Sequence, residues 1–318
     1  MSDPRVLRHV VESISPASAA HAEGARQRVH AAGAPSVERL AALLGGAQHT
    51  ARPRTARRAI VVALGDHGAG DPGIALGASH PTVVAARAID AGEAALAHLA
   101  RQARAPIVLV DAGTAEPAHL PASVIRLGRG PSAATPPALT VVEAALLLEA
   151  GIALATSLAE PGLDLVALGA VGLGAELAAA ALAGAAIGGP PPTLGDPGAE
   201  AAWARGAAYG PADPLARLAE FGGPDTALLA GLILACASTN IAVILDSYAT
   251  GAAALAACAF APAAAGSLVA AHAGSGAHGA ILAHLGLVPL FAGGLGHGEG
   301  TGAALALPLA DQVAVLAE

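Results

Sequence analysis

Short apolar runs rich in β-branched residues alternate along this chain with longer alanine-rich stretches. Each run ends in glycine, aspartate or serine, and a helical pattern follows it. Strands that alternate with helices in this way predict an α/β fold built on a parallel sheet. Ligands bind such sheets beyond the carboxyl ends of the strands, so we expect the functional residues there. The predicted strands are Ala59–Leu64, Pro106–Val110, Asp164–Leu168 and Ile241–Leu245.

Two apolar segments approach the length of about 20 residues that a membrane-spanning helix needs. Residues 228–245 contain the polar turn 238–240 followed by a β-branched run, which predicts a helix, a turn and a buried strand. Residues 139–159 carry Glu143 and Glu149, which predict an amphipathic helix. The N-terminus has no apolar core of the signal-peptide type. We therefore expect neither a membrane span nor secretion.

The composition points to a tightly packed core and excludes some partners. Hydrophobic residues make up 54% of the 318 residues but aromatic residues only 2%, so the core must consist of small side chains. All 16 basic residues are arginines, the net charge is −8 and no basic stripe is present, so we expect no nucleic-acid partner. Cys236 and Cys258 have neither metal-ligand spacing nor a disulfide-rich context, which fits a reducing cytoplasm.

Three glycine-rich turns are candidates for binding a phosphate or another anion, and the first of them could also hold a metal ion. They are residues 65–68 (GDHG), 169–174 (GAVGLG) and 270–278 (AAHAGSGAH). Backbone amides at a helix N-terminus can bind phosphate, and each turn precedes or adjoins a predicted helix. A structural turn explains each of them as well, and GAVGLG does not match the dinucleotide-binding pattern GxGxxG.

A different glycine-rich stretch, residues 293–304 (GGLGHGEGTGAA), carries a single acid, Glu299. Glycines let a backbone approach a ligand closely, and the following residues begin a helix. Burial in an apolar chain tends to raise the pKa of a carboxyl group into the range that suits a general base. A helix dipole alone would favour an acid here but would not explain the glycines around it.

The same stretch carries a family resemblance. Residues 293–309 (GGLGHGEGTGAALALPL) closely resemble the C-terminal signature LRLGEGTGAALALPL of the nicotinate-nucleotide:dimethylbenzimidazole phosphoribosyltransferase family. Ordered matches run along nearly the whole chain, among them PRTARRAIVVALGDHGAG, GEAALAHLARQARAPIVLVDAGT, DPLARLAEFGGPDTALLAGLILA and IAVILDSYATGAAALAA. Several ordered matches are far more specific than any single motif.

The resemblance implies an activity and an architecture. The family transfers phosphoribose from nicotinate mononucleotide to 5,6-dimethylbenzimidazole or a related lower-ligand base, which gives α-ribazole phosphate for cobalamin, without a metal or another cofactor. Its members are homodimers with a three-layer, Rossmann-like parallel sheet and a small helical domain formed from both chain ends. We expect residues 1–58 in the small domain, 59–290 in the large domain, and 291–318 as the active-site loop and helix that complete the small domain.

The resemblance also implies roles for individual residues. Glu299 matches the catalytic glutamate, which takes the proton from the base. The expected base-binding residues are Ser79, Arg87, Leu295 and His297. The expected phosphoribose-binding residues are Gly172, Gly174, Arg205, Gly274 and Ser275. The expected structural residues of the site loops are Asp66, His67 and Asp246.

Departures from the family pattern leave two interpretations open. Ala170 stands where the family motif GEMGIGNT has a glutamate, and the family's active-site lysine is missing, with Arg205 nearby. The chain is then either an active transferase with an altered base preference, or a degenerate paralogue that binds a ligand or pairs with an active subunit in a two-subunit, phenol-using enzyme. A nucleotide-binding Rossmann protein outside the family would not explain the match around Glu299.

Overall fold

The computed structural model describes residues 4–68, 73–128, 130–133, 136–273, 276–295 and 298–318. Its centre is a parallel six-stranded sheet in the order β3-β2-β1-β4-β5-β6. The α/β prediction is therefore confirmed, and two short strands, β3 and β6, extend the four that we predicted. The strands are β1 (Arg58–Gly65), β2 (Ile107–Gly113), β3 (Ile125–Arg126), β4 (Leu165–Val171), β5 (Ala242–Leu245) and β6 (Leu268–Ala270).

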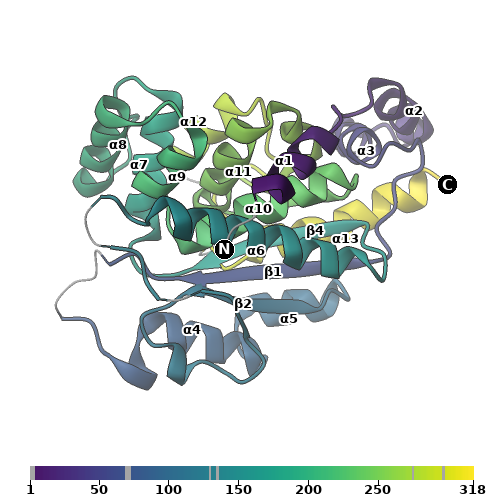
Figure 1. Ribbon diagram of the computed structural model, residues 1–318. Helices are drawn as coiled ribbons and strands as arrows, with labels where there is room; N and C mark the ends of the chain where they lie inside the picture. Colours follow the sequence, from purple (N-terminus) through teal and green to yellow (C-terminus); the bar gives the residue numbers. More distant parts are fainter. Residues whose placement is uncertain (1–3, 69–72, 129, 134–135, 274–275, 296–297) are drawn as a thin grey trace.

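Helices cover both faces of this sheet (Figure 1). They are α1 (Pro4–Ser13), α2 (Ala19–Val29), α3 (Pro35–Ala47), α4 (Pro81–Asp90), α5 (Ala95–Gln102), α6 (Val141–Ala159), α7 (Ala175–Ile187), α8 (Pro197–Tyr209), α9 (Pro214–Phe221), α10 (Pro224–Ser238), α11 (Tyr248–Phe260), α12 (Gly276–His284) and α13 (Thr301–Leu316). Short 3-10 turns lie at His30–Ala32, Gly77–Ser79, Pro117–His119 and Pro262–Ser267.

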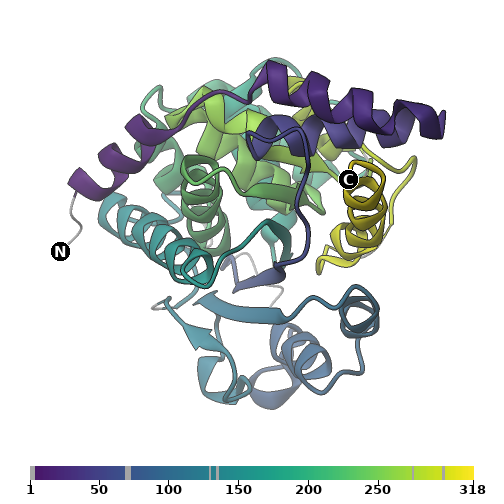
Figure 2. The same cartoon turned by 90° about the vertical axis from the view of Figure 1, so that its right-hand side faces the viewer.

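Side chains of β1 alternate between two cores, as the period of a strand requires. Val61 and Ala63 pack with α6, α7, α10 and α11. Ile60, Val62 and Leu64 pack with α3, α4, α5 and α13 on the other face. Figures 1 and 2 show α4 and α5 on the opposite side of the sheet from α6 and α10. A strand that is buried on both faces reads as a continuous apolar run, which is why the sequence revealed it.

Small residues bring α6 and α10 into backbone contact. A Cβ on Gly151 of α6 would overlap the carbonyl oxygen of Leu228, and a Cβ on Gly231 of α10 would overlap that of Leu148. By length and composition alone, α6 is the one helix in the described part of the chain that is long and apolar enough to cross a membrane. Its close packing against α10 is that of a core helix.

Segments from the two chain ends lie side by side. Helix α13 contacts α2 and α3, and Figure 2 shows these helices as neighbours. Arg58 follows the N-terminal helices in the sequence. Its guanidinium forms an ion pair of 2.6 Å with Asp311 of α13, and the Thr55 hydroxyl donates to the same carboxylate. This packing suits a small domain made from both ends, and the boundaries at residues 58 and 290 stay a prediction.

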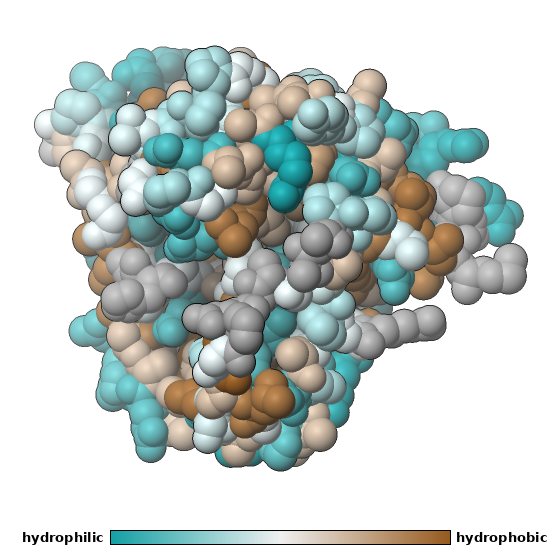
Figure 3. All heavy atoms as spheres, turned by 90° about the vertical axis from the view of Figure 1, so that its left-hand side faces the viewer, coloured by the Kyte–Doolittle hydropathy of each residue, from teal (hydrophilic) through white to brown (hydrophobic). Residues whose placement is uncertain are grey.

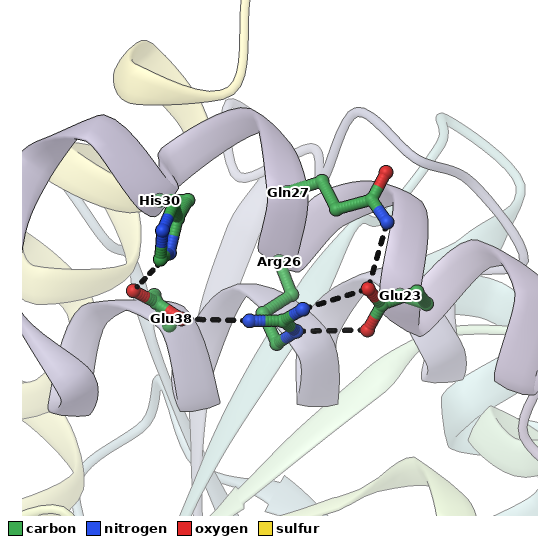
Figure 4. Close-up of polar contacts among 5 residues, drawn as sticks. All are labelled: Glu23, Arg26, Gln27, His30 and Glu38. Atoms are coloured by element: carbon green, nitrogen blue, oxygen red, sulfur yellow. Dashed lines mark hydrogen bonds and ion pairs between the residues drawn. The ribbon is translucent and has the colours of Figure 1, made fainter.

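A polar network on the surface joins α2 to α3 (Figure 4). Arg26 donates to both carboxylate oxygens of Glu23 on its own helix and to Glu38 on α3. Gln27 also donates to Glu23, and His30 lies 2.8 Å from Glu38. The hydrogen bonds from Arg26 lower the pKa of Glu23 to about 2, and those from His30 and Arg26 lower the pKa of Glu38. The network fixes how the two helices lie against each other.

Candidate active site

A cavity of about 840 Å³ opens beyond the carboxyl ends of β4 and β5. Ala170 at the end of β4, Ser247 after β5 and Glu299 before α13 line it, together with Gly172 and the first turn of α7. Figure 3 looks onto this end of the molecule, the left-hand side of Figure 1, toward which β1 points. Glu299, the candidate base, therefore lies beyond the carboxyl ends of the strands, where we expected functional residues.

The loop that carries Glu299 is bound to β4 by its backbone. The amide of Ala170 donates to the carbonyl oxygen of Gly298 over 3.0 Å. A Cβ on Gly169 would overlap the carbonyl oxygen of Glu299, and Gly300 has a φ of +103°, a left-handed conformation that favours glycine. We expected Gly300, one of the glycines beside Glu299, to let a ligand approach. The structure gives Gly169 and Gly300 another role, which is to let two backbones meet.

Asp246, immediately after β5, holds the start of α13 and with it the Glu299 loop. Its buried carboxylate accepts hydrogen bonds from the amides of Gly300 (3.1 Å) and Ala303 (2.9 Å). These amides would otherwise lack partners at the helix N-terminus. Burial raises the pKa of Asp246, while the Ala303 amide and the nearby imidazole of His272 oppose that rise. Asp246, which we predicted to be a structural residue of a site loop, thus anchors the N-terminus of α13.

His272 links this anchor to the residues before Glu299. Its Nδ1 accepts a hydrogen bond from the amide of Leu295 over 3.3 Å, so the proton of the neutral ring sits on Nε2. Nε2 lies 3.8 Å from Asp246 Oδ1. A Cβ on Gly302 would overlap the His272 ring. We expected Leu295 to contact the substrate base. In the structure its backbone amide binds His272, and its side chain does not line the cavity.

Carboxylates dominate the charged groups of the cavity wall. Glu176 in the first turn of α7 and Asp196 before α8 line the cavity with Glu299, and no arginine does so among the described residues. Burial raises the pKa of the Tyr248 hydroxyl in the same wall, and the negative charges of Glu176 and Asp196 raise it further. Such a wall favours a ligand that carries positive charge or donates hydroxyl hydrogen bonds. Glu176, Asp196 and Tyr248 were not among the predicted site residues.

His278 on α12 also lines the cavity and is buried. Burial, and then the neighbouring His272, lowers its pKa from 6.5 to about 4. Because the unfolded chain binds this proton more readily than the folded chain, we expect the free energy of unfolding to fall as the pH drops from 7 to 4. The contribution of this one group is roughly 3 kcal/mol. Urea denaturation across this pH range should show the slope in the wild type and a shallower one in His278→Gln. Parallel curves would contradict the prediction.

The turn between β4 and α7 packs tightly against the end of β1 at Gly172. A Cβ on Gly172 would overlap the carbonyl oxygen of Gly65, and Gly174 begins α7 with a φ of +73°. Between them, the amide of Leu173 donates to Asp66 Oδ1 over 3.1 Å. Gly172 lines the cavity, so its backbone remains a candidate for phosphate binding.

Asp66 joins the ends of three strands rather than the cavity. Its buried carboxylate accepts hydrogen bonds from the Thr82 hydroxyl (2.6 Å) and from the amides of Ala115 and Leu173. This is the structural turn that we weighed against a metal or phosphate site. Its neighbour His67 is equally buried, and its Nε2 lies 3.0 Å from Asp225 Oδ1. Among the described residues, no group of three or more His, Cys, Asp or Glu side chains could hold a metal ion.

The remaining predicted residues do not meet at Glu299. Ser79 ends a 3-10 turn, and Arg87 of α4 donates from Nε to the carbonyl oxygen of His119 over 3.0 Å; neither lines the cavity. Arg205 of α8 lines a different cavity. The base-binding role of Ser79 and Arg87 stays a prediction. His297, Gly274 and Ser275 lie outside the described residues.

Comparisons with known proteins show which family this chain resembles. A family model described as "Phosphoribosyltransferase" matches residues 14–318. A nicotinate-nucleotide–dimethylbenzimidazole phosphoribosyltransferase of Desulforudis audaxviator is 32% identical and matches 98% of this chain and 94% of its own. One of Pseudomonas putida W619 is 37% identical over 88% of this chain and 85% of its own.

Solved structures give the same result. The crystal structure of the enzyme with this name from Thermus thermophilus aligns with a TM-score of 0.78 at 29% identity, over 99% of this chain and 96% of that one. The fold and the sequence matches thus agree along nearly the full length. The chain belongs to the phosphoribosyltransferase family whose members include these nicotinate-nucleotide–dimethylbenzimidazole phosphoribosyltransferases.

Proposed function

We propose that this protein transfers phosphoribose from nicotinate mononucleotide to a ring nitrogen of 5,6-dimethylbenzimidazole or a related base. The product is α-ribazole phosphate, the lower nucleotide of cobalamin. The relatives' names support this activity. The observation that carries it is the position of Glu299, held by β4 and by Asp246 at the wall of a cavity of about 840 Å³.

Glu299 acts as the general base. One ring nitrogen of the base attacks the anomeric carbon of the ribose, and the other loses its proton to the Glu299 carboxylate. The bond between the anomeric carbon and the nicotinate nitrogen breaks, and its electron pair neutralises the positive charge on that nitrogen. The leaving group therefore needs no acid. Since a single proton changes place, one carboxylate at this position is enough for the proton transfer.

Glu176 and Asp196 supply negative charge on the same wall. Positive charge develops at the ribose as the bond to nicotinate weakens, and fixed carboxylates stabilise it. They compensate in this chain for the family glutamate that Ala170 replaces. We assign the phosphate to the backbone at Gly172 and Gly174 and to Gly274 and Ser275, since amides at a helix N-terminus favour anions.

We further propose that the protein is a cytoplasmic homodimer. The cysteine usage, with Cys236 and Cys258 both unpaired, suits a reducing compartment. The names of the relatives favour an active enzyme over a degenerate partner subunit, because every relative reported above is named as a transferase.

The test is nicotinate release. Purified protein is incubated with nicotinate mononucleotide and, in separate reactions, with 5,6-dimethylbenzimidazole, benzimidazole, adenine and phenol, and nicotinate is quantified by chromatography. We expect release that depends on a base, with a benzimidazole preferred. Folded protein that releases no nicotinate with any base would contradict the proposal and favour the partner-subunit interpretation.

A further inference from the structure

A second cavity of about 180 Å³ lies beyond β1, on the other face of the α7 N-terminus from the Glu299 cavity. Gly174, Leu177, Ala178 and Ala181 line it from one face of the α7 segment, whereas Ala175 and Glu176 line the Glu299 cavity. In the strand order of this sheet, β1 and β4 flank the point where the order reverses, and open α/β sheets bind ligands at that point.

Two buried side chains of this cavity carry polar atoms that have no hydrogen-bond partner in the described part of the chain. Neither ring nitrogen of His67 nor Ser132 Oγ makes a hydrogen bond with the described residues, although both side chains are only 4% exposed. Of these atoms, His67 Nε2 lies within ion-pair distance of Asp225, which leaves Nδ1 and Ser132 Oγ without a partner. Their backbones pair with each other, and both residues line the cavity. Buried polar atoms are almost always hydrogen-bonded, so two orphans on one wall indicate a bound group that supplies the partners.

The charges around His67 make its ring a donor. Burial lowers the pKa of His67, but the opposing charge of Asp225, 3.0 Å from Nε2, and then that of Asp66 raise it above its usual value overall. With Nε2 facing Asp225, a protonated ring carries a second N–H on Nδ1, at the edge of the ring that lies next to Gly223. The carboxylate of Asp225 also accepts a hydrogen bond from the Thr226 amide.

A guanidinium adds further donors at the exposed side of the cavity. Arg205 lies over the Phe221 ring at 6.0 Å and makes no ion pair or hydrogen bond with the described residues. Glu220 is the acid that lines the cavity with it. An imidazolium, a hydroxyl and a planar guanidinium around a small cavity match a group with several acceptor oxygens.

We propose that this cavity binds a tetrahedral oxyanion through His67, Ser132 and Arg205. The chemistry is that of a phosphoryl group, which comes either from free inorganic phosphate or from the phosphate of a bound nucleotide. The site stands apart from the Glu299 cavity and does not depend on the transferase activity. Arg205 was expected to bind phosphoribose in the Glu299 cavity. The proposal instead places its ligand in the cavity on the other face of α7.

Calorimetric titration with sulfate tests the site, because sulfate stays a dianion from pH 8 to pH 6 and any pH dependence belongs to the protein. We expect wild-type affinity to rise as the pH falls and Arg205→Met to bind sulfate on the order of tenfold more weakly. Arg8→Met, which changes an exposed arginine of α1, is the control and should bind like the wild type. His67→Gln should lose the pH dependence.

Ser132→Ala provides a measurement that does not depend on the charged residues, and we expect it to weaken binding severalfold at both pH values. Equal sulfate affinity in the wild type, Arg205→Met and Ser132→Ala, or no binding to the wild type, would overturn the proposal. Nicotinate mononucleotide and its riboside, which lacks the phosphate, then distinguish the source. Displacement of sulfate by the mononucleotide alone assigns the site to the phosphate of a nucleotide. Retention of sulfate in the presence of both assigns it to free phosphate.

Discussion

Replacing Glu299 by glutamine is expected to lower the rate of nicotinate release by about two to four orders of magnitude, the range that a positioned general base contributes. Glutamine keeps the size and the hydrogen-bonding shape of the side chain but cannot accept the proton of the base. The loop is held by hydrogen bonds of its own backbone: the Ala170 amide donates to the Gly298 carbonyl oxygen, and the Gly300 amide donates to the Asp246 carboxylate. Because neither involves the Glu299 side chain, the change should leave the loop in place.

The measurement compares kcat and KM for both substrates in the wild type and in Glu299→Gln. We expect the loss in kcat, with KM for nicotinate mononucleotide little changed, since the carboxylate acts on the other substrate. Glu160→Gln is the matched control, because Glu160 is an exposed acid at the end of α6, away from the cavity. A Glu299→Gln variant that kept more than about a tenth of the activity would remove Glu299 from the role of base.

The central strands could be predicted from the sequence because each is a short β-branched run between alanine-rich helices. The two added strands could not. β3 spans two residues, both exposed, and β6 spans three, all buried, so neither is long enough to establish a pattern. Their positions follow from pairing with β2 and β5, which is a property of the sheet rather than of the local sequence.

The site was predictable only where a residue stands out locally. Glu299 stands out because it is the single acid in a glycine-rich stretch. The contribution of Asp246 depends on two amides more than fifty residues further along the chain, and nothing in the sequence around Asp246 indicates that contact. Glu176 reads as an ordinary acid in the first turn of a helix until the fold places it on the same cavity wall as Glu299. The pairing of His67 with Asp225 likewise arises from the way β1 and α10 pack.

Replacing Gly169 by alanine is expected to damage catalysis although it removes no polar side chain. Gly169 is buried at the carboxyl end of β4, and the new Cβ would overlap the carbonyl oxygen of Glu299 and press on the amide of Gly300. Since these are backbone atoms, the loop must move as a unit. Displacing a catalytic group by about 1 Å can cost on the order of 100-fold in rate. The overlap should also lower the free energy of unfolding by about 1–3 kcal/mol.

Gly279→Ala separates this effect from the general consequences of replacing a glycine. Gly279 lies on α12 with open space around it, so alanine there should stabilise the helix by roughly 0.5–1 kcal/mol and leave nicotinate release unchanged. Urea denaturation gives the stability of each variant, and activity is measured where both are folded. Reduced stability with full activity in Gly169→Ala would mean that the loop moves without displacing the carboxylate. A large loss of kcat in a folded Gly169→Ala would show that the contact between β4 and the loop determines where Glu299 stands.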